Sequence, residues 1–107
     1  MRPESSPRAR SEYDAVAIAL ESSGVVPGSM FGMPCLKIGR KTLAGLWGDA
    51  MNFKLPPEPR AQALALPGAE PFDPGMGRPM KEWVLVPLEH SASWTRYAEQ
   101  AMEFVRE

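Results

Sequence analysis

Two short glycine-containing breaks divide the middle of the chain into three short apolar segments. The segments are Cys35 to Ile38, Thr42 to Trp47 and Ala50 to Leu55, separated by Gly39 to Lys41 and by Gly48 to Asp49. Breaks of two or three residues are the usual length of β-hairpin connections. The spacing therefore predicts three consecutive antiparallel strands.

Alternation along these strands predicts which face of the sheet is buried. With Gly48 and Asp49 as a two-residue loop, Leu46 lies opposite Met51, and residues two apart share a face. A three-residue first connection then brings Leu36 and Ile38 to the same side. The predicted core side carries Ala44, Leu46, Met51, Phe53 and Leu55. The predicted outer side carries Lys37, Leu43, Gly45, Trp47, Asn52 and Lys54.

Amphipathic helices are predicted at both ends of the chain. Near the N-terminus the apolar stripe begins at Tyr13, and Ser11 is placed to cap the helix. Residues 1–10 are predicted to form a flexible tail. The C-terminal stripe repeats at i, i+3, i+4, i+7, i+8 and i+11. Its members are Trp94, Tyr97, Ala98, Ala101, Met102 and Val105.

The segment between Leu55 and the last helix is predicted to hold a short helix, a long loop and one more strand. The short helix begins within Pro56 to Pro59 and presents Ala61, Leu64 and Ala65. Proline and glycine dominate residues 67–79, which predicts an irregular loop held down by Phe72. Residues 81–86 are apolar on both faces, which is typical of a strand inside a sheet.

The predicted fold is a two-layer α+β domain over residues 11–107, with helices on one face of a mainly antiparallel sheet. Apolar residues make up 44% of the 107-residue chain and charged residues 23%, as in globular domains. No apolar run is long enough to cross a bilayer, and the N-terminal residues do not fit a secretory signal. A cytoplasmic protein without membrane association is expected.

Charge and the metal-binding residue types limit the function. The formal net charge is −1, which disfavours nucleic acid as a partner, although residues 33–60 hold five basic and two acidic residues. Cys35 and His90 are the only cysteine and histidine, so no internal disulfide and no Cys/His zinc site can form. No metal and no cofactor are predicted.

Several short motifs resemble the N-terminal domain of TfoX-like proteins, over a stretch from about Ser11 to the end. They are Met30-Phe31-Gly32, Gly39-Arg40-Lys41 before Leu43, Asn52-Phe53-Lys54, Phe72 with Pro74 and Gly75, Met80-Lys81-Glu82-Trp83 with Pro87, and Trp94 with Ala98. The resemblance implies an α-β(3)-α-β(2)-α layout, related to YjbR-like proteins and to secretion-chaperone-like folds that often dimerise. It supplies no established catalytic residues. TfoX is associated with the regulation of DNA-uptake competence and carries a second, C-terminal domain, so the resemblance to its N-terminal domain does not by itself assign that role to this sequence.

Few residues have the setting of a catalytic or binding site. A Cys35–His90 nucleophile and base pair has no motif-linked acid, and we predict no enzymatic activity. Seven side chains are predicted to bind a ligand or a partner. Arg78 and Lys81 belong to a glycine-containing turn that suits an anion, and Lys41 and Lys54 are cations at strand ends. Leu43 and Trp47 form an apolar patch on the outer face of the sheet, and Trp83 is the seventh residue. For Trp47, burial under the loop of residues 67–79 is an equally weighted alternative.

Three functions follow from these residues. The first is a non-enzymatic protein-interaction or regulatory module, a homodimer joined through the open sheet face or an edge strand. The second is a nucleic-acid-binding accessory domain using Lys37, Arg40, Lys41 and Lys54. The third is a small-molecule or anion site between sheet and loop, lined by Arg78, Lys81 and Trp83.

Overall fold

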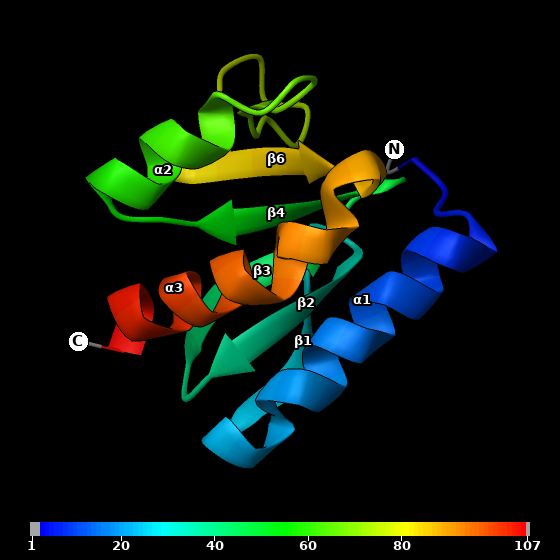
Figure 1. Ribbon diagram of the computed structural model, residues 1–107, viewed down its shortest axis with the longest axis vertical. Helices are drawn as coiled ribbons and strands as arrows, with labels where there is room; N and C mark the ends of the chain where they lie inside the picture. Colours follow the sequence, from blue (N-terminus) through cyan, green and yellow to red (C-terminus); the bar gives the residue numbers. More distant parts are fainter. Residues whose placement is uncertain (1–2, 107) are drawn as a thin grey trace.

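A computed structural model describes residues 3–106 (Figure 1). Within these residues the chain forms three α-helices, two 3₁₀ segments and one six-stranded antiparallel sheet with the strand order β1-β2-β3-β4-β6-β5. The helices and 3₁₀ segments are α1 (Pro7–Leu20), η1 (Glu21–Ser23), α2 (Pro57–Leu64), η2 (Leu88–Ser93) and α3 (Trp94–Arg106). The strands are β1 (Val25–Met30), β2 (Met33–Ile38), β3 (Lys41–Leu46), β4 (Ala50–Lys54), β5 (Glu70–Pro71) and β6 (Trp83–Pro87).

The helices cover one face of the sheet, which confirms the predicted two-layer α+β class. Helix α1 lies over β1, α3 crosses β3 and β4, and α2 lies beside β6 (Figure 1). Every member of the predicted α3 stripe is buried in the main core. Trp94 is fully buried, and its indole Nε1 donates a hydrogen bond to the carbonyl oxygen of Val86 at 3.2 Å. The aromatic end of α3 is thereby fixed on the sheet.

Four consecutive strands precede α2, one more than the three that were predicted. Residues 25–38 form a hairpin of β1 and β2, which pair from Val25 with Ile38 to Met30 with Met33. The turn residues Phe31 and Gly32 both have positive φ, 53° and 78°, as the tight turn of a two-residue hairpin requires. Phenylalanine rarely adopts this conformation, so the turn gave no signal in the sequence.

The predicted outward position of Leu43 is wrong. The β2–β3 connection has two residues, and Lys41 pairs with Ile38. The register then shifts between Leu36, which pairs with Ala44, and Lys37, which pairs with Thr42. Leu43 is the extra residue of this bulge and is fully buried in the main core. The bulge therefore supplies the one-residue offset between β2 and β3 that a three-residue turn was predicted to supply.

The N-terminal helix begins earlier than predicted. Ser6, not Ser11, is the N-cap, and its hydroxyl accepts a hydrogen bond from the backbone N–H of Ala9 at 3.1 Å. The hydroxyl of Ser5 donates to the carbonyl oxygen of Gly48 at 2.7 Å, and the backbone N–H of Ser6 donates to Asp49 Oδ1 at 2.7 Å. Ser5 and Ser6 are therefore attached to the β3–β4 loop, and residues 7–10 of the predicted tail belong to α1. Met1 and Arg2 of the predicted tail lie outside the described residues.

Helix α2 also differs from the prediction. Ala63 is its buried residue, whereas Ala61, Leu64 and Ala65 are exposed. Two turns with several prolines give too few positions to define a stripe from the sequence.

The loop between α2 and β6 partly covers the outer face of the sheet. This agrees with the alternative prediction that Trp47 lies under the loop of residues 67–79. Phe72 is fully buried there, and Trp83 and Leu85 of β6 face the same side. We call this group the outer cluster. It consists of Met33, Phe72 and Trp83 with the partly buried Met30, Trp47, Met80 and Leu85.

Candidate functional site

The largest hollow of the candidate site, about 500 Å³, lies at the end of the sheet where β3 begins and β4 ends. Antiparallel pairing brings these ends together, and Lys54 pairs with Trp83 at the start of β6. Phe104 and Val105, in the last turn of α3, close the other side. The hollow is lined by Lys41, Thr42, Lys54, Met80, Glu82, Trp83, Phe104 and Val105.

Two smaller hollows adjoin this one. The first, about 280 Å³, shares Lys41 and adds Arg40 and Arg106. The second, about 430 Å³, shares Met80 and adds Arg78 and Lys81. We call the three together the basic track. Its basic side chains are Arg40, Lys41, Lys54, Arg78, Lys81 and Arg106.

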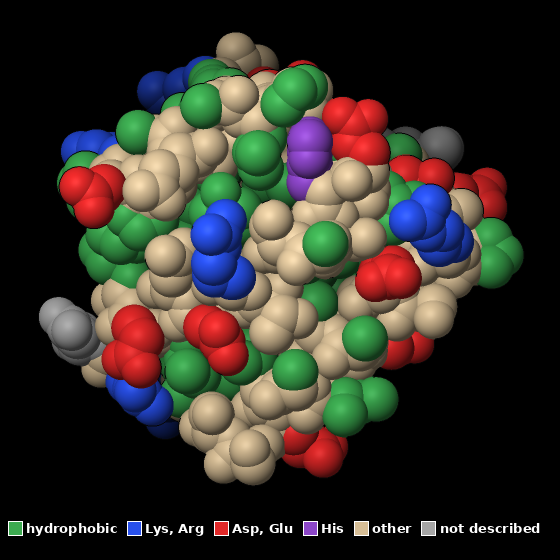
Figure 2. Space-filling model, in the orientation of Figure 1, with side chains coloured by type: hydrophobic (Ala, Val, Ile, Leu, Met, Phe, Trp, Pro, Cys, Tyr) green, Lys and Arg blue, Asp and Glu red, His purple; other side chains and the backbone are tan. Residues whose placement is uncertain are grey.

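The basic track carries a local excess of positive charge although the whole chain has a net charge of −1. Among the described residues that line it, six are basic and one, Glu82, is acidic. Charges act over about 10 Å at 0.1 M salt, so a bound anion responds to these neighbours and not to the net charge. On the helix-covered face, by contrast, acidic and basic side chains are interspersed (Figure 2).

The single carboxylate of the track has a basic neighbour. Arg60 of α2 donates two hydrogen bonds to the carbonyl oxygen of Leu55, from Nε at 3.1 Å and from Nη2 at 2.9 Å. The same Nη2 lies 3.6 Å from Glu82 Oε2. Glu82 has a φ of 76°, and its carbonyl oxygen accepts a hydrogen bond from the N–H of Leu55 at 2.9 Å. Arg60 thus offsets the charge of Glu82 beside a strained backbone position.

The structure brings together five of the seven predicted binding residues. Lys41, Lys54 and Trp83 line the central hollow, and Arg78 and Lys81 line the next one. The sequence analysis had placed Lys41 and Lys54 in the nucleic-acid hypothesis and Arg78, Lys81 and Trp83 in the small-molecule hypothesis. The roles of Arg60 and Glu82 were missed because neither residue belongs to a recognisable motif.

Leu43 and Trp47 do not form the predicted outer patch. Leu43 lies in the main core on the helix side of the sheet. Trp47 is half-buried, and its ring meets that of Phe72 edge to face at 5.2 Å between centroids. The loop thus covers much of the apolar surface that was proposed as a homodimer interface.

Asn52 is the one fully buried polar side chain among the described residues. Its Nδ2 donates to Met33 Sδ at 3.4 Å, while its Oδ1 has no hydrogen-bond partner. The side chain lies against Gly45, where an added Cβ would approach Asn52 Oδ1 to 3.0 Å. The family-like motif included Asn52, but nothing in the sequence predicted its burial.

Cys35 and His90 lie in separate settings. Cys35 is fully buried, and this burial raises the pKa of its thiol, although a hydrogen bond with Thr42 acts in the opposite direction. The Nε2 of His90 donates to the carbonyl oxygen of Pro67 at 2.7 Å. Within residues 3–106, no group of three or more His, Cys, Asp or Glu side chains could hold a metal ion.

No helix in the described part of the chain is both long and apolar enough to span a bilayer. No family model matches the chain, and neither a curated protein nor a solved structure matches it. The TfoX resemblance therefore stays a prediction from the motifs. The basic track is the strongest functional feature of the described residues.

Proposed function

We propose that the chain is a non-enzymatic module that binds single-stranded nucleic acid along the basic track. The observation that carries this proposal is the lining of three adjoining hollows by six basic side chains and one acidic side chain. Proteins bind single strands with a positively charged groove that follows successive phosphates, together with surfaces for the bases. Nucleic-acid binding was ranked second because of the net charge of the chain. The local charge of the basic track ranks it first.

The apolar lining supports a nucleic acid over a simple inorganic anion. Phe104 and Met80 lie beside Lys54 in the central hollow, and Met76 lines the hollow that holds Arg78. Trp83 is almost fully buried and forms a floor, whereas Met76 is 58% exposed. A flexible single strand can place phosphates on the cations and bases on these apolar side chains.

The test is fluorescence anisotropy of a labelled twelve-nucleotide oligomer between 50 and 300 mM salt. Each phosphate contact to a single strand contributes about 0.7 to the slope of log K against log salt. Lys54→Gln should reduce the slope by about 0.7 and weaken binding about fivefold at 0.1 M salt. Arg8→Gln removes an exposed charge of α1 outside the track and should change neither value. Binding that does not depend on the salt concentration, or equal losses of affinity in Lys54→Gln and Arg8→Gln, would refute the proposal.

A protein-interaction module remains the second candidate, now with a different surface. Phe31 and Val26 on the β1–β2 hairpin are 51% and 50% exposed, and β1 is an edge strand. Pro27 lacks the N–H that strand addition would use, so side chains would make the contact. Light scattering should then show a dimer that Phe31→Asn converts to a folded monomer, because asparagine tolerates positive φ. A monomeric parent protein excludes the homodimer.

A further inference from the structure

Glu82 lines the central hollow of the basic track from a backbone position where glycine is the usual residue. Residues 80–83 form a turn, closed by a hydrogen bond from the N–H of Trp83 to the carbonyl oxygen of Met80 at 3.2 Å. Glu82 is the third residue of this turn and has a φ of 76°. Turns with a positive φ at the third residue favour glycine or asparagine there. The carboxylate is therefore held at the hollow at a cost in backbone strain, which is common at functional positions.

The ion pair with Arg60 does not account for this strain. Arg60 Nη2 and Glu82 Oε2 are 3.6 Å apart, longer than a hydrogen bond, and the two side chains are 26% and 31% exposed. Partly exposed pairs of this kind contribute little to stability. Within residues 3–106, no hydrogen bond uses either carboxylate oxygen of Glu82. The two oxygens are thus accessible from the hollow and open to a ligand that donates hydrogen bonds.

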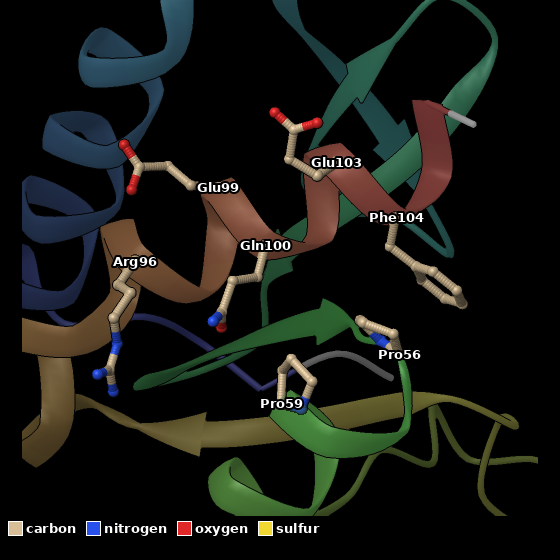
Figure 3. Close-up of a pocket in the computed structure, with 7 residues that line it drawn as sticks. All are labelled: Pro56, Pro59, Arg96, Glu99, Gln100, Glu103 and Phe104. Carbon is tan, nitrogen blue, oxygen red and sulfur yellow. The ribbon is translucent and has the colours of Figure 1, made fainter.

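Apolar side chains from both layers of the fold surround this carboxylate. Met80 packs on the outer cluster and Phe104 packs on the main core, and both line the central hollow. Figure 3 shows the ring of Phe104 extending from the last turn of α3 on the side of Pro56, away from the carboxylate of Glu103. The hollow, about 500 Å³, is within the range of about 300–1,000 Å³ that is typical of small-molecule sites. A nucleobase in it would meet one carboxylate, that of Glu82.

Guanine is the common base whose hydrogen-bonding edge matches a carboxylate. Its Watson–Crick edge presents two neighbouring donors, N1–H and N2–H, whereas an ionised carboxylate has two oxygens that only accept. Adenine and cytosine present one amino donor beside a ring-nitrogen acceptor. Thymine and uracil present one N–H between two carbonyl oxygens. These four bases therefore bring a lone pair toward the carboxylate, and a single strand leaves this edge free to be read.

We infer that Glu82 selects guanine in the strand that the basic track binds, an inference that rests on the proposed function. The N1–H and N2–H of one guanine donate to the two carboxylate oxygens of Glu82, and the ring lies against the apolar lining. Lys54, in the same hollow, contacts a phosphate of this or the next nucleotide. With any other base the carboxylate repels the strand without a compensating hydrogen-bond pair. Glu82 thus favours guanine by attraction and disfavours the other bases by repulsion.

Fluorescence anisotropy at 0.1 M salt with four labelled twelve-nucleotide strands tests this selection. Each strand is thymine throughout except at one central position, which holds guanine, adenine, hypoxanthine or thymine. The guanine strand should bind about tenfold more tightly than the all-thymine strand, as expected for a bidentate contact between a side chain and a base. Hypoxanthine keeps N1–H but lacks the 2-amino group, so its strand should bind about threefold more weakly than the guanine strand. This comparison changes the ligand alone and does not depend on the folding of a variant.

Three variants separate the reading of guanine from the binding of phosphates. Glu82→Gln removes the negative charge and one acceptor, so it should bind the all-thymine strand no more weakly than the parent protein and prefer guanine by only about threefold. Lys54→Gln should weaken the binding of all four strands about fivefold and keep the tenfold preference. Glu58→Gln, an exposed carboxylate in the first turn of α2 outside the track, is the matched control and should change neither value.

The outcomes distinguish this inference from the proposed function. Equal affinity for the guanine and all-thymine strands, with the salt dependence retained, would overturn the selection of guanine and leave the proposed function standing. Equal affinity for the guanine and hypoxanthine strands, or a Glu82→Gln variant that weakens every strand equally and keeps the preference, would also overturn it. Salt-independent binding of all four strands would refute both.

Discussion

Phe72 is the residue that we expect to attach the loop of residues 67–82 to the sheet. Its side chain is fully buried, and its ring contacts Trp47 edge to face at 5.2 Å and Trp83 at 6.4 Å between centroids. Its backbone N–H donates a hydrogen bond to the carbonyl oxygen of Trp83 at 3.0 Å, and its carbonyl oxygen accepts one from the backbone N–H of Met80 at 2.8 Å. Phe72→Ala removes the ring contacts and leaves these backbone groups in place.

The expected loss in the free energy of unfolding is about 3 kcal/mol. Phenylalanine to alanine changes in protein cores cost about 3–5 kcal/mol, a range that includes the loss of aromatic pairs. The lower end applies because the outer cluster lies under a loop, which can collapse toward the space that the ring leaves. With a urea m-value of about 2 kcal/mol/M, the midpoint should fall by about 1.5 M.

Urea unfolding followed by circular dichroism and by tryptophan fluorescence measures this loss. Trp47 and Trp83 both belong to the outer cluster, so fluorescence also reports whether the loop detaches before the sheet unfolds. Met76→Ala, in the same loop but 58% exposed, is the matched control and should change the stability by less than about 0.5 kcal/mol. A loss below about 1 kcal/mol for Phe72→Ala, with an unchanged m-value, would refute the reasoning.

Two further predictions concern buried polar and ionisable groups. Asn52→Leu should raise the free energy of unfolding by about 1–2 kcal/mol in the same urea assay, because it removes the unpartnered Oδ1; a loss of stability would contradict this. Burial raises the pKa of Tyr13 and of Cys35, so the stability that their neutral forms provide is lost as the pH rises above about 9 to 10. In pH-dependent thermal unfolding, Tyr13→Phe should therefore show a shallower alkaline decline than the parent protein, and identical declines would show that Tyr13 does not contribute.

Periodicity predicted the elements that bury a complete face. The α3 stripe from Trp94 to Val105 is buried at every predicted position. The β3–β4 register is also as predicted, with Leu46 opposite Met51 and Ala44 opposite Phe53. In these segments the apolar spacing and the tertiary packing require the same arrangement. A single sequence is then sufficient to assign both the element and its face.

The residues that sequence reasoning missed depend on contacts between distant segments. Ser6 caps α1 while its backbone binds Asp49, 43 residues away. Arg60 acts on the site through Glu82 of another segment. Gln100 is polar and lies between buried positions of the α3 stripe, so nothing marks its oxygen as buried and unpartnered. Local patterns carry no information about such pairs until the topology is known.

The bulge at Leu43 connects the main error of prediction to the candidate site. In a two-residue turn Lys41 shares the core side with Ile38, and strict alternation would then point Ala44 and Leu46 outward. The β3–β4 pairing requires both residues to face the core, so one extra residue must be accommodated between Thr42 and Ala44. Leu43 is that residue, and its apolar side chain stabilises the bulge by entering the core. Because the turn itself stays short, Lys41 and Thr42 become strand residues at the sheet end, where both line the same hollow as Lys54. The irregularity that buries Leu43 therefore also positions Lys41 of the basic track.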